Sequence, residues 1–165
     1  MIKWKVKSLV KELIIGALLL FILTNIISYI RKPELPYTQV PELEVELLDG
    51  TTYKVDKGKP LVLHFWATWC PTCKLEAANI QSVSHDYEVL SIAVNSGDKA
   101  TIKTYMHDRD LTFRVVNDLD GQWAEKFNVE AYPTTFIYNA SGELQFTEVG
   151  YTTTAGLLAR LKLAE

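Results

Sequence analysis

Blocks of apolar residues alternate with polar, turn-forming segments along the chain and predict short strands and helices in a regular order. The predicted strands cover residues 44–48, 52–55, 61–66, 89–94, 113–116, 134–138 and 145–149. The predicted helices cover residues 71–85, 99–108, 121–127 and 153–162. Strands that alternate with helices, followed by two strands joined by a turn and a last helix, predict an α/β fold with a mixed sheet covered by helices.

Two segments carry the clearest signals for their structure. The run 61–66 (LVLHFW) is almost entirely apolar, as expected for a central strand that is covered on both faces. Asp49-Gly50 separates two alternating segments and predicts a β-hairpin. For the helix that begins at Pro71, we expect these residues on the inner side: Leu75, Ala78, Ile80 and Val83.

The segment from Leu13 to Ile30 is an 18-residue run without a charge. Roughly 17–25 apolar residues span a bilayer as a helix, whereas the apolar region of a cleaved signal peptide is about 7–15 residues long and ends in small residues. The run ends instead in Ser-Tyr-Ile-Arg-Lys, so an uncleaved anchor is the preferred interpretation over a cleaved signal. We expect a basic cytoplasmic segment (1–12), an anchor (13–30), a linker (31–41) and a folded domain (42–165).

Charge is distributed unevenly between the two ends of the chain. Residues 1–32 contain six Lys or Arg and one acid, whereas the other 133 residues contain eleven basic and nineteen acidic residues. Four lysines precede the apolar run and two basic residues follow it, so the positive-inside rule places the domain on the outer, periplasmic side of a bacterial-type inner membrane. The acidic domain repels phosphate backbones, which excludes nucleic acid as a partner.

The chain has two cysteines, Cys70 and Cys73, in a Cys-Pro-Thr-Cys motif. At the start of a helix the two sulfurs lie one turn apart, and the helix dipole brings a thiol pKa from about 8.5 to roughly 3.5–7.5. Pro71 fits the first helical position, where no backbone hydrogen bond is lost. We therefore expect Cys70 to be the exposed attacking thiol and Cys73 to resolve the mixed disulfide.

A zinc or copper site is the alternative interpretation of the cysteine pair. Zinc needs two further Cys or His ligands, and the three histidines (His64, His85 and His107) are scattered. Copper favours methionine, and only Met1 and Met106 are present. We expect redox chemistry with no metal and no cofactor.

Three motifs in combination resemble those of the thioredoxins: HFWATWCPTC after an apolar strand, Tyr-Pro-Thr-Thr at 132–135, and Val149-Gly150. The closer resemblance is to the membrane-tethered periplasmic branch, which includes the TlpA/ResA-like disulfide reductases, the cytochrome c biogenesis reductases and suppressor for copper sensitivity protein D. The short basic leader, the anchor and the Arg-Lys-Pro that follows it resemble the last of these. The resemblance covers roughly residues 34–165 and implies a thioredoxin fold with an N-terminal β-hairpin and an insertion between its two halves.

The same resemblance implies a substrate groove beside the cysteines. Pro133 matches the cis-proline, which leaves the preceding backbone groups free to pair with an extended peptide. The groove would be formed by these residues together: Trp69, Pro71, Thr72, Tyr132 and Pro133. Tyr132 is bulkier than many residues before the cis-proline, so a narrower groove is expected.

Glu76 and His64 are candidate groups for proton transfer. Glu76 matches the acid three residues beyond the second cysteine and lies one turn beyond Cys73, where it could exchange that thiol's proton; a solvated helix carboxylate is the alternative. His64 occupies the position of the thioredoxin buried acid, shares a strand face with Trp66 and is either a relay group or a hydrogen-bonded core histidine. Ala78 stands where the family often has proline, and this departure bears on partner choice.

These observations predict a periplasmic disulfide reductase that acts through Cys70 and Cys73. The expected partners are a disulfide-bearing substrate protein and a membrane electron donor of the thiol–disulfide interchange type. A disulfide oxidase or isomerase is the alternative within the same class, because the sequence does not fix the direction of the reaction. A CxxC copper- or zinc-binding module and a structural adaptor are the alternatives from other classes.

Overall fold

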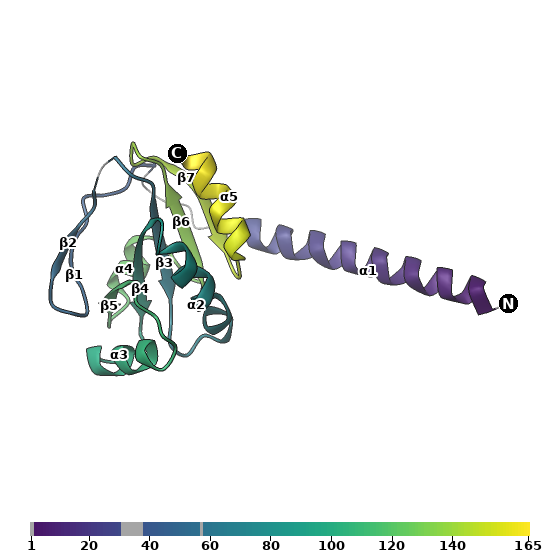
Figure 1. Cartoon of the computed structure of the whole chain (residues 1–165), viewed down its shortest axis with the longest axis horizontal. Coiled ribbons are helices and arrows are strands. Elements are labelled where there is room, and N and C mark those ends of the chain that lie inside the picture. Colours follow the sequence, from purple (N-terminus) through teal and green to yellow (C-terminus); the bar gives the residue numbers. More distant parts are fainter. Residues whose placement is uncertain (1, 31–37, 57) are drawn as a thin grey trace. The chain divides into compact units, whose positions relative to one another are not determined.

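The structure, a computed structural model, describes residues 2–30, 38–56 and 58–165, and within the first helix it describes side chains only at 10–23, 25, 26 and 30. The chain divides into two units, residues 1–32 and 33–165. Helix α1 (Ile2–Ile30) forms the first unit (Figure 1). Among the described residues no helix combines the length and hydropathy needed to cross a membrane, so the expected anchor is not confirmed. Most of the expected linker, residues 31–37, lies outside the described residues.

The second unit is built on a five-stranded mixed sheet in the order β5-β4-β3-β6-β7 (Figure 1). The central strand β3 pairs in parallel with β4 and antiparallel with β6, so the polarity of the sheet changes at its middle. The strands have these bounds: β3 (Leu61–Trp66), β4 (Glu88–Val94), β5 (Arg114–Asp118), β6 (Thr134–Tyr138) and β7 (Leu144–Val149). The expected mixed α/β sheet is confirmed.

A separate two-stranded hairpin, β1 (Glu44–Glu46) and β2 (Thr52–Lys54), precedes the sheet. Its turn is the predicted one: the Thr51 N–H donates to Asp49 Oδ1 over 2.9 Å, and Gly50 adopts a φ of 87°, which glycine tolerates without strain. Both strands are shorter than expected: β2 ends at Lys54, and β1 ends at Glu46, after which the backbone N–H of Leu48 donates to the carbonyl of Val115 in β5.

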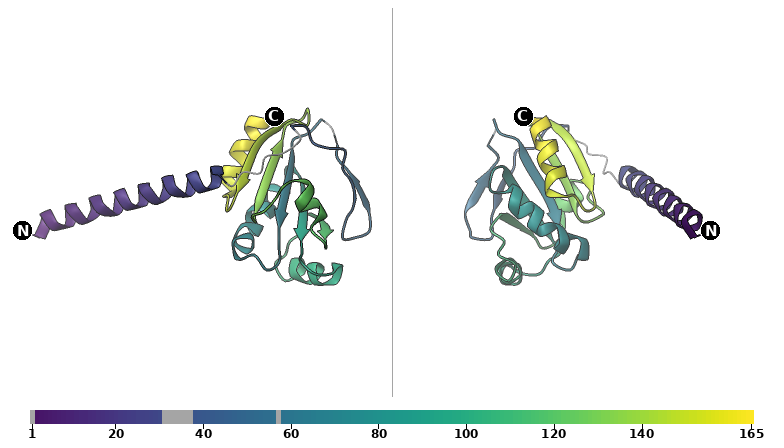
Figure 2. Two further views of the ribbon diagram at one scale, coloured as in Figure 1. Left: turned by 180° about the vertical axis from the view of Figure 1, so that it is seen from behind. Right: turned by 45° about the vertical axis from the view of Figure 1, so that its right-hand side comes forward.

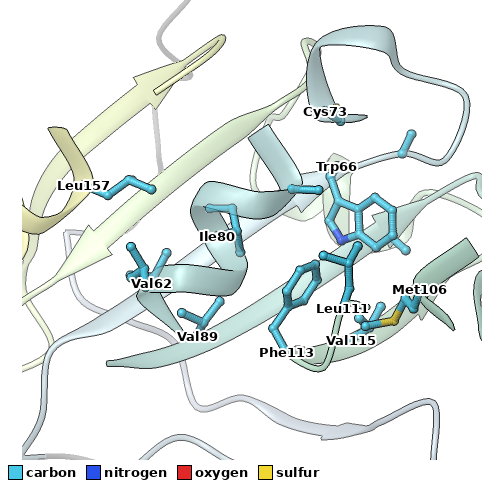
Figure 3. Close-up of a cluster of buried hydrophobic side chains, with 14 of the residues drawn as sticks. Val62, Trp66, Cys73, Ile80, Val89, Met106, Leu111, Phe113, Val115 and Leu157 are labelled. Carbon is cyan, nitrogen blue, oxygen red and sulfur yellow. The ribbon is translucent and has the colours of Figure 1, made fainter. Parts of the chain in front are cut away.

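In the part of this unit that the structure describes, four helices cover the sheet: α2 (Pro71–Val83), α3 (Lys99–His107), α4 (Gln122–Lys126) and α5 (Thr154–Ala164). Helices α2, α3 and α5 bury their apolar residues against one face of the sheet, and the hairpin and α4 cover the other (Figures 1 and 2). Figure 3 shows the buried cluster on the first of these faces, in which Ile80 of α2 and Leu157 of α5 lie with Val62 and Trp66 of β3; Cys73 lies at the Trp66 end. Helix α2, whose N-cap residue is Cys70, is thus packed on the central strand.

Two details of the sequence prediction are wrong. Leu75 is 72% exposed and Ala78 is exposed, whereas Glu76 and Ala77 face the core. The helix phase is set by Cys73 and Ile80, which are both buried and lie two turns apart. The expected strand over residues 113–116 instead begins at Arg114 and extends to Asp118, whose carboxylate accepts hydrogen bonds from the Trp123 and Ala124 N–H groups and so fixes the start of α4.

Candidate active site at the Cys70–Cys73 disulfide

Cys70 and Cys73 form a disulfide at the amino-terminal end of α2, with their Cα atoms 5.3 Å apart. Cys70 is the N-cap residue: its backbone is extended, and its sulfur accepts the Cys73 N–H over 3.1 Å. Pro71 occupies the first turn, as expected. The free N–H groups and the positive end of the helix dipole therefore stabilise a thiolate at Cys70 once the disulfide is reduced.

Both cysteines are buried in the disulfide form, with exposed fractions of 4% for Cys70 and 2% for Cys73. The expectation that Cys70 is exposed is therefore wrong for this form. The reason is the loop before β6, because the carbonyl oxygen of Tyr132 lies 3.6 Å from the sulfur of Cys70.

The peptide bond between Tyr132 and Pro133 is cis, which confirms the expectation for Pro133. The Pro133 carbonyl accepts the Gly150 N–H over 2.8 Å, and the Thr134 hydroxyl donates to the Ala131 carbonyl over 2.8 Å. The loop is thereby fixed at both ends beside Cys70.

Trp69 and Tyr132 form an aromatic pair next to the disulfide. Their rings meet edge to face with centroids 5.8 Å apart, and Trp69 is 56% exposed. The Trp69 indole N–H donates to the backbone carbonyl of Asn95 over 3.0 Å, and Asn95 has a left-handed φ of 45°. Pro71 is exposed and Thr72 is half-buried on the first turn of α2. Sequence reasoning missed Asn95, because its contribution is a backbone carbonyl 26 residues away from Trp69.

Glu76 is completely buried, one turn after Cys73 on the inner side of α2. Its Oε1 accepts the Thr152 N–H over 2.8 Å, and its Oε2 has no hydrogen-bond partner among the described residues. Burial raises the pKa of Glu76 to about 8, against the opposing effect of the Thr152 N–H. The interpretation of Glu76 as a solvated helix carboxylate is therefore wrong.

His64 lies in the middle of β3 with 2% of its surface exposed. Its Nδ1 is 2.9 Å from the Thr135 hydroxyl on the neighbouring strand, and burial lowers its pKa to about 3. A histidine of this pKa stays neutral at physiological pH, which favours the interpretation as a hydrogen-bonded core residue. The described hydrogen bond of Glu76 runs to the loop before α5, whereas that of His64 runs to β6.

Groups of three or more His, Cys, Asp or Glu side chains that could bind a metal ion do not occur among the residues that the structure describes. The features gathered around the disulfide are instead a helix N-terminus, a cis-proline, an aromatic pair and a buried carboxyl group. This combination matches dithiol redox chemistry, in which one sulfur must be stabilised as an anion and the other must lose a proton.

Comparison with known families agrees with this chemistry. The model of the AhpC/TSA family matches residues 36–147, which is more than half of the chain. The chain belongs to the AhpC/TSA family. A thioredoxin-like protein of Haemophilus influenzae is similar to this AhpC/TSA protein, at 32% identity over 165 residues and 98% of each chain.

Two further similarities concern named redox proteins. Thiol-disulfide oxidoreductase ResA of Bacillus subtilis is 36% identical over 113 residues, which cover 65% of this chain and 63% of ResA. The crystal structure of a secreted Mycobacterium tuberculosis disulfide oxidoreductase, described as homologous to Escherichia coli DsbE, superposes with a TM-score of 0.65 at 26% identity and covers 74% of this chain and 96% of that one. The fold of residues 38–165 is thus thioredoxin-like, and the Cys70–Cys73 pair gives this family member a dithiol redox function.

Proposed function

We propose that this AhpC/TSA-family protein is a membrane-anchored disulfide reductase whose thioredoxin-like domain works outside the cytoplasm. The observation that carries the proposal is the Cys70–Cys73 disulfide at the N-terminus of α2, facing the cis-proline loop at Tyr132. The names of the similar proteins, thiol-disulfide oxidoreductase and disulfide oxidoreductase, support the reaction class.

The reaction proceeds in two steps from the reduced dithiol. The Cys70 thiolate attacks one sulfur of a substrate disulfide, so that a mixed disulfide forms and the other substrate sulfur leaves as a thiolate. Cys73 then loses its proton and attacks Cys70; the bond between Cys70 and the substrate breaks, and the electron pair leaves with the substrate sulfur. The substrate disulfide gains two electrons, and the Cys70–Cys73 pair is oxidised to the form seen here.

Glu76 is the proposed acceptor of the Cys73 proton. It is buried on the same side of α2 as Cys73, and its Oε2 is not occupied by a hydrogen bond among the described residues. A carboxyl group whose pKa is raised toward the working pH exchanges protons efficiently. His64, which is neutral and bound to Thr135, has a structural role in this proposal.

The proposed location of the domain, outside the cytoplasm, is inferred from the sequence. The charge-free run from Leu13 to Ile30 has a length that suits a single membrane crossing, and basic residues are in excess on its amino-terminal side. The proposed partners follow from this place: an exported protein with a disulfide as substrate, and a membrane protein of the thiol–disulfide interchange type that reduces Cys70–Cys73 again.

The direction of the reaction is tested by the reduction potential of the full chain, equilibrated in detergent with glutathione or dithiothreitol buffers. A reductase should lie near the value of thioredoxin, about −270 mV, rather than near that of the oxidant DsbA, about −120 mV. Cys70→Ser, which removes the couple, is the control. A potential near −120 mV would contradict the reductase assignment and favour the oxidase, and a value near −180 mV would favour an isomerase.

A further inference from the structure

Residues 150–152, between β7 and α5, join the cis-proline loop to helix α2. The Gly150 N–H donates to the Pro133 carbonyl over 2.8 Å. Two residues later, the Thr152 N–H donates to Glu76 Oε1 over 2.8 Å, and the Thr152 carbonyl accepts from Asn79 Nδ2 over 2.9 Å. Both backbone polar groups of Thr152 are therefore bound by side chains of α2.

Asn79 lies one turn after Glu76 on α2 and is half-buried. Its Nδ2 must be the atom that faces Thr152, because a carbonyl oxygen only accepts hydrogen bonds. The Thr154 hydroxyl donates to Asn79 Oδ1 over 3.0 Å and holds the amide in this orientation. Asn79 therefore fixes the distance between α2 and the Thr152 peptide, and with it the N–H group that Glu76 accepts.

We propose that Asn79 is a positioning residue for proton transfer at Glu76. By holding the Thr152 carbonyl, Asn79 keeps the Thr152 N–H on Glu76 Oε1, so that Oε2 remains the atom that takes the proton of Cys73. This inference rests on the proposed role of Glu76. It assigns to Asn79 an indirect function, through the Thr152 peptide and without contact with the substrate or the cysteines.

Charged side chains elsewhere in the chain do not shift the pKa of Glu76 in place of the Thr152 N–H. Titratable side chains on α2 and on the elements around it include His64, Tyr132, Glu148, Tyr151 and Arg160, together with Lys74 on α2 itself, Tyr105 on α3, and Lys162 and Glu165 at the end of the chain. Glu148 is paired with Arg160 over 2.8 Å, and His64 is neutral. None of these groups is among the causes of the Glu76 pKa shift, which are burial and then the Thr152 N–H. The Thr152 N–H is thus the one group among these causes that favours the carboxylate.

The first test is the pH dependence of the resolution step in Asn79→Ala. Without the bond to Thr152, the N–H that lowers the Glu76 pKa is held less firmly, so the midpoint of the resolution rate should move up by about one pH unit. At pH 7 the rate should fall by about tenfold, because one unit is a tenfold change in carboxylate below the midpoint. Formation of the mixed disulfide should be unchanged. Stopped-flow mixing of the reduced full chain with a disulfide peptide separates the two steps.

Gln81→Ala is the matched control. Gln81 lies on the same helix and also makes two hydrogen bonds to a distant residue, because its Oε1 accepts the Thr112 N–H over 2.7 Å and its Nε2 donates to the Thr112 hydroxyl over 2.9 Å. Its loss should lower the stability of the chain in the same way but leave the pH midpoint in place. An equal shift in Gln81→Ala would show a general effect of loosening α2 and would overturn the assignment to Asn79.

A double-mutant cycle separates failure of this inference from failure of the role of Glu76. In a Glu76→Gln background, Asn79→Ala should have no further effect on resolution. A further slowing there, or an unshifted midpoint in Asn79→Ala alone, would overturn the positioning role while the role of Glu76 stands. An unchanged resolution rate in Glu76→Gln alone would overturn both.

A measurement on the wild-type chain tests the same inference even if Asn79→Ala does not fold. In a pH titration followed by nuclear magnetic resonance, the amide proton of Thr152 should shift with the same midpoint as the Glu76 carboxyl group. A Thr152 amide that does not follow the titration of Glu76 would overturn the proposal.

Discussion

At the scale of single residues, the site contains two buried titratable groups whose pKa values are shifted by burial in opposite directions. Glu76 and His64 are both almost inaccessible, and burial disfavours the charged form of each. The carboxyl pKa therefore rises to about 8 and the imidazole pKa falls to about 3. Only the first value lies close enough to neutrality for proton exchange during turnover, so Glu76 is the proposed proton acceptor and His64 is assigned to the core.

Glu76→Gln should slow resolution of the mixed disulfide by about 10- to 100-fold, at the low end of the effect of a general base. Formation of the mixed disulfide should change little, because it depends on the Cys70 thiolate. In the wild-type chain the resolution rate should rise with pH through about pH 8, where Glu76 becomes a carboxylate. Stopped-flow rates of both steps from pH 5 to pH 9 provide the measurement, and an unchanged profile in the variant would contradict a role for Glu76.

His64→Ala should act on stability, lowering the free energy of unfolding by roughly 2–4 kcal/mol through a cavity and the loss of the bond to Thr135. Because the folded pKa lies below the unfolded value of 6.5, the unfolded state binds the proton first, and the wild type loses stability as pH falls from 6.5 toward 3. This loss should be smaller in His64→Ala. Urea unfolding at several pH values measures it, and His107→Ala, at an exposed histidine, is the control. A kinetic loss in His64→Ala larger than that in Glu76→Gln would transfer the proton role to His64.

At the scale of elements, the sequence predicts β3 and α2 well because their signals are local. An unbroken apolar run defines β3, and Cys70-Pro71 marks the first turn of α2. The face of α2 that is buried, in contrast, is not determined by a local signal. Pattern rules place Leu75 inward because burial of a carboxyl group is unfavourable, yet Glu76 is the buried residue. Its partner, the Thr152 N–H, is 76 residues away, and no pattern within the helix reveals it.

The packing of α2 on the sheet can be tested at Ile80, which is fully buried between the helix and β3 (Figure 3). Ile80→Ala should lower the free energy of unfolding by about 2–5 kcal/mol, because it leaves a cavity in the cluster that holds the helix. Ser82→Ala, at an exposed position of the same helix, should change it by less than about 0.5 kcal/mol. Urea unfolding of both variants makes the comparison, and equal losses would place the helix outside the cooperative core.

At the scale of the whole molecule, the chain joins a helix and a thioredoxin-like domain of opposite charge. Residues 1–32 carry an excess of basic residues, six against one acid, whereas the domain carries an excess of acidic residues, nineteen against eleven bases. The charge-free run and this distribution are the basis of the proposed anchor and its orientation, which stay predictions. The resemblance to suppressor for copper sensitivity protein D also stays a prediction. The fold and the dithiol were predictable from motifs, whereas the contacts that tie residues 150–152 to α2 arise only when the chain folds.

The proposed topology predicts that residues 33–165 lie outside the cytoplasm. A reporter that is active only in the cytosol, fused to the C-terminus, should be inactive, and one that is active only after export should give signal. Replacing Lys3, Lys5 and Lys7 by Glu should weaken this orientation, because the positive-inside bias depends on these charges. Activity of the cytosolic reporter would contradict the orientation, and a mature N-terminus beyond residue 30 would contradict the anchor.

The central claim is that Cys70 attacks the substrate and Cys73 resolves the mixed disulfide. It is tested most directly by comparing Cys73→Ser and Cys70→Ser in cells and counting trapped mixed disulfides by mass spectrometry. Cys73→Ser should accumulate disulfides between Cys70 and substrate proteins, because the attacking thiol remains at the helix N-terminus and no resolving thiol is left. Cys70→Ser should trap few or none. Trapping by Cys70→Ser, with none by Cys73→Ser, would contradict the account.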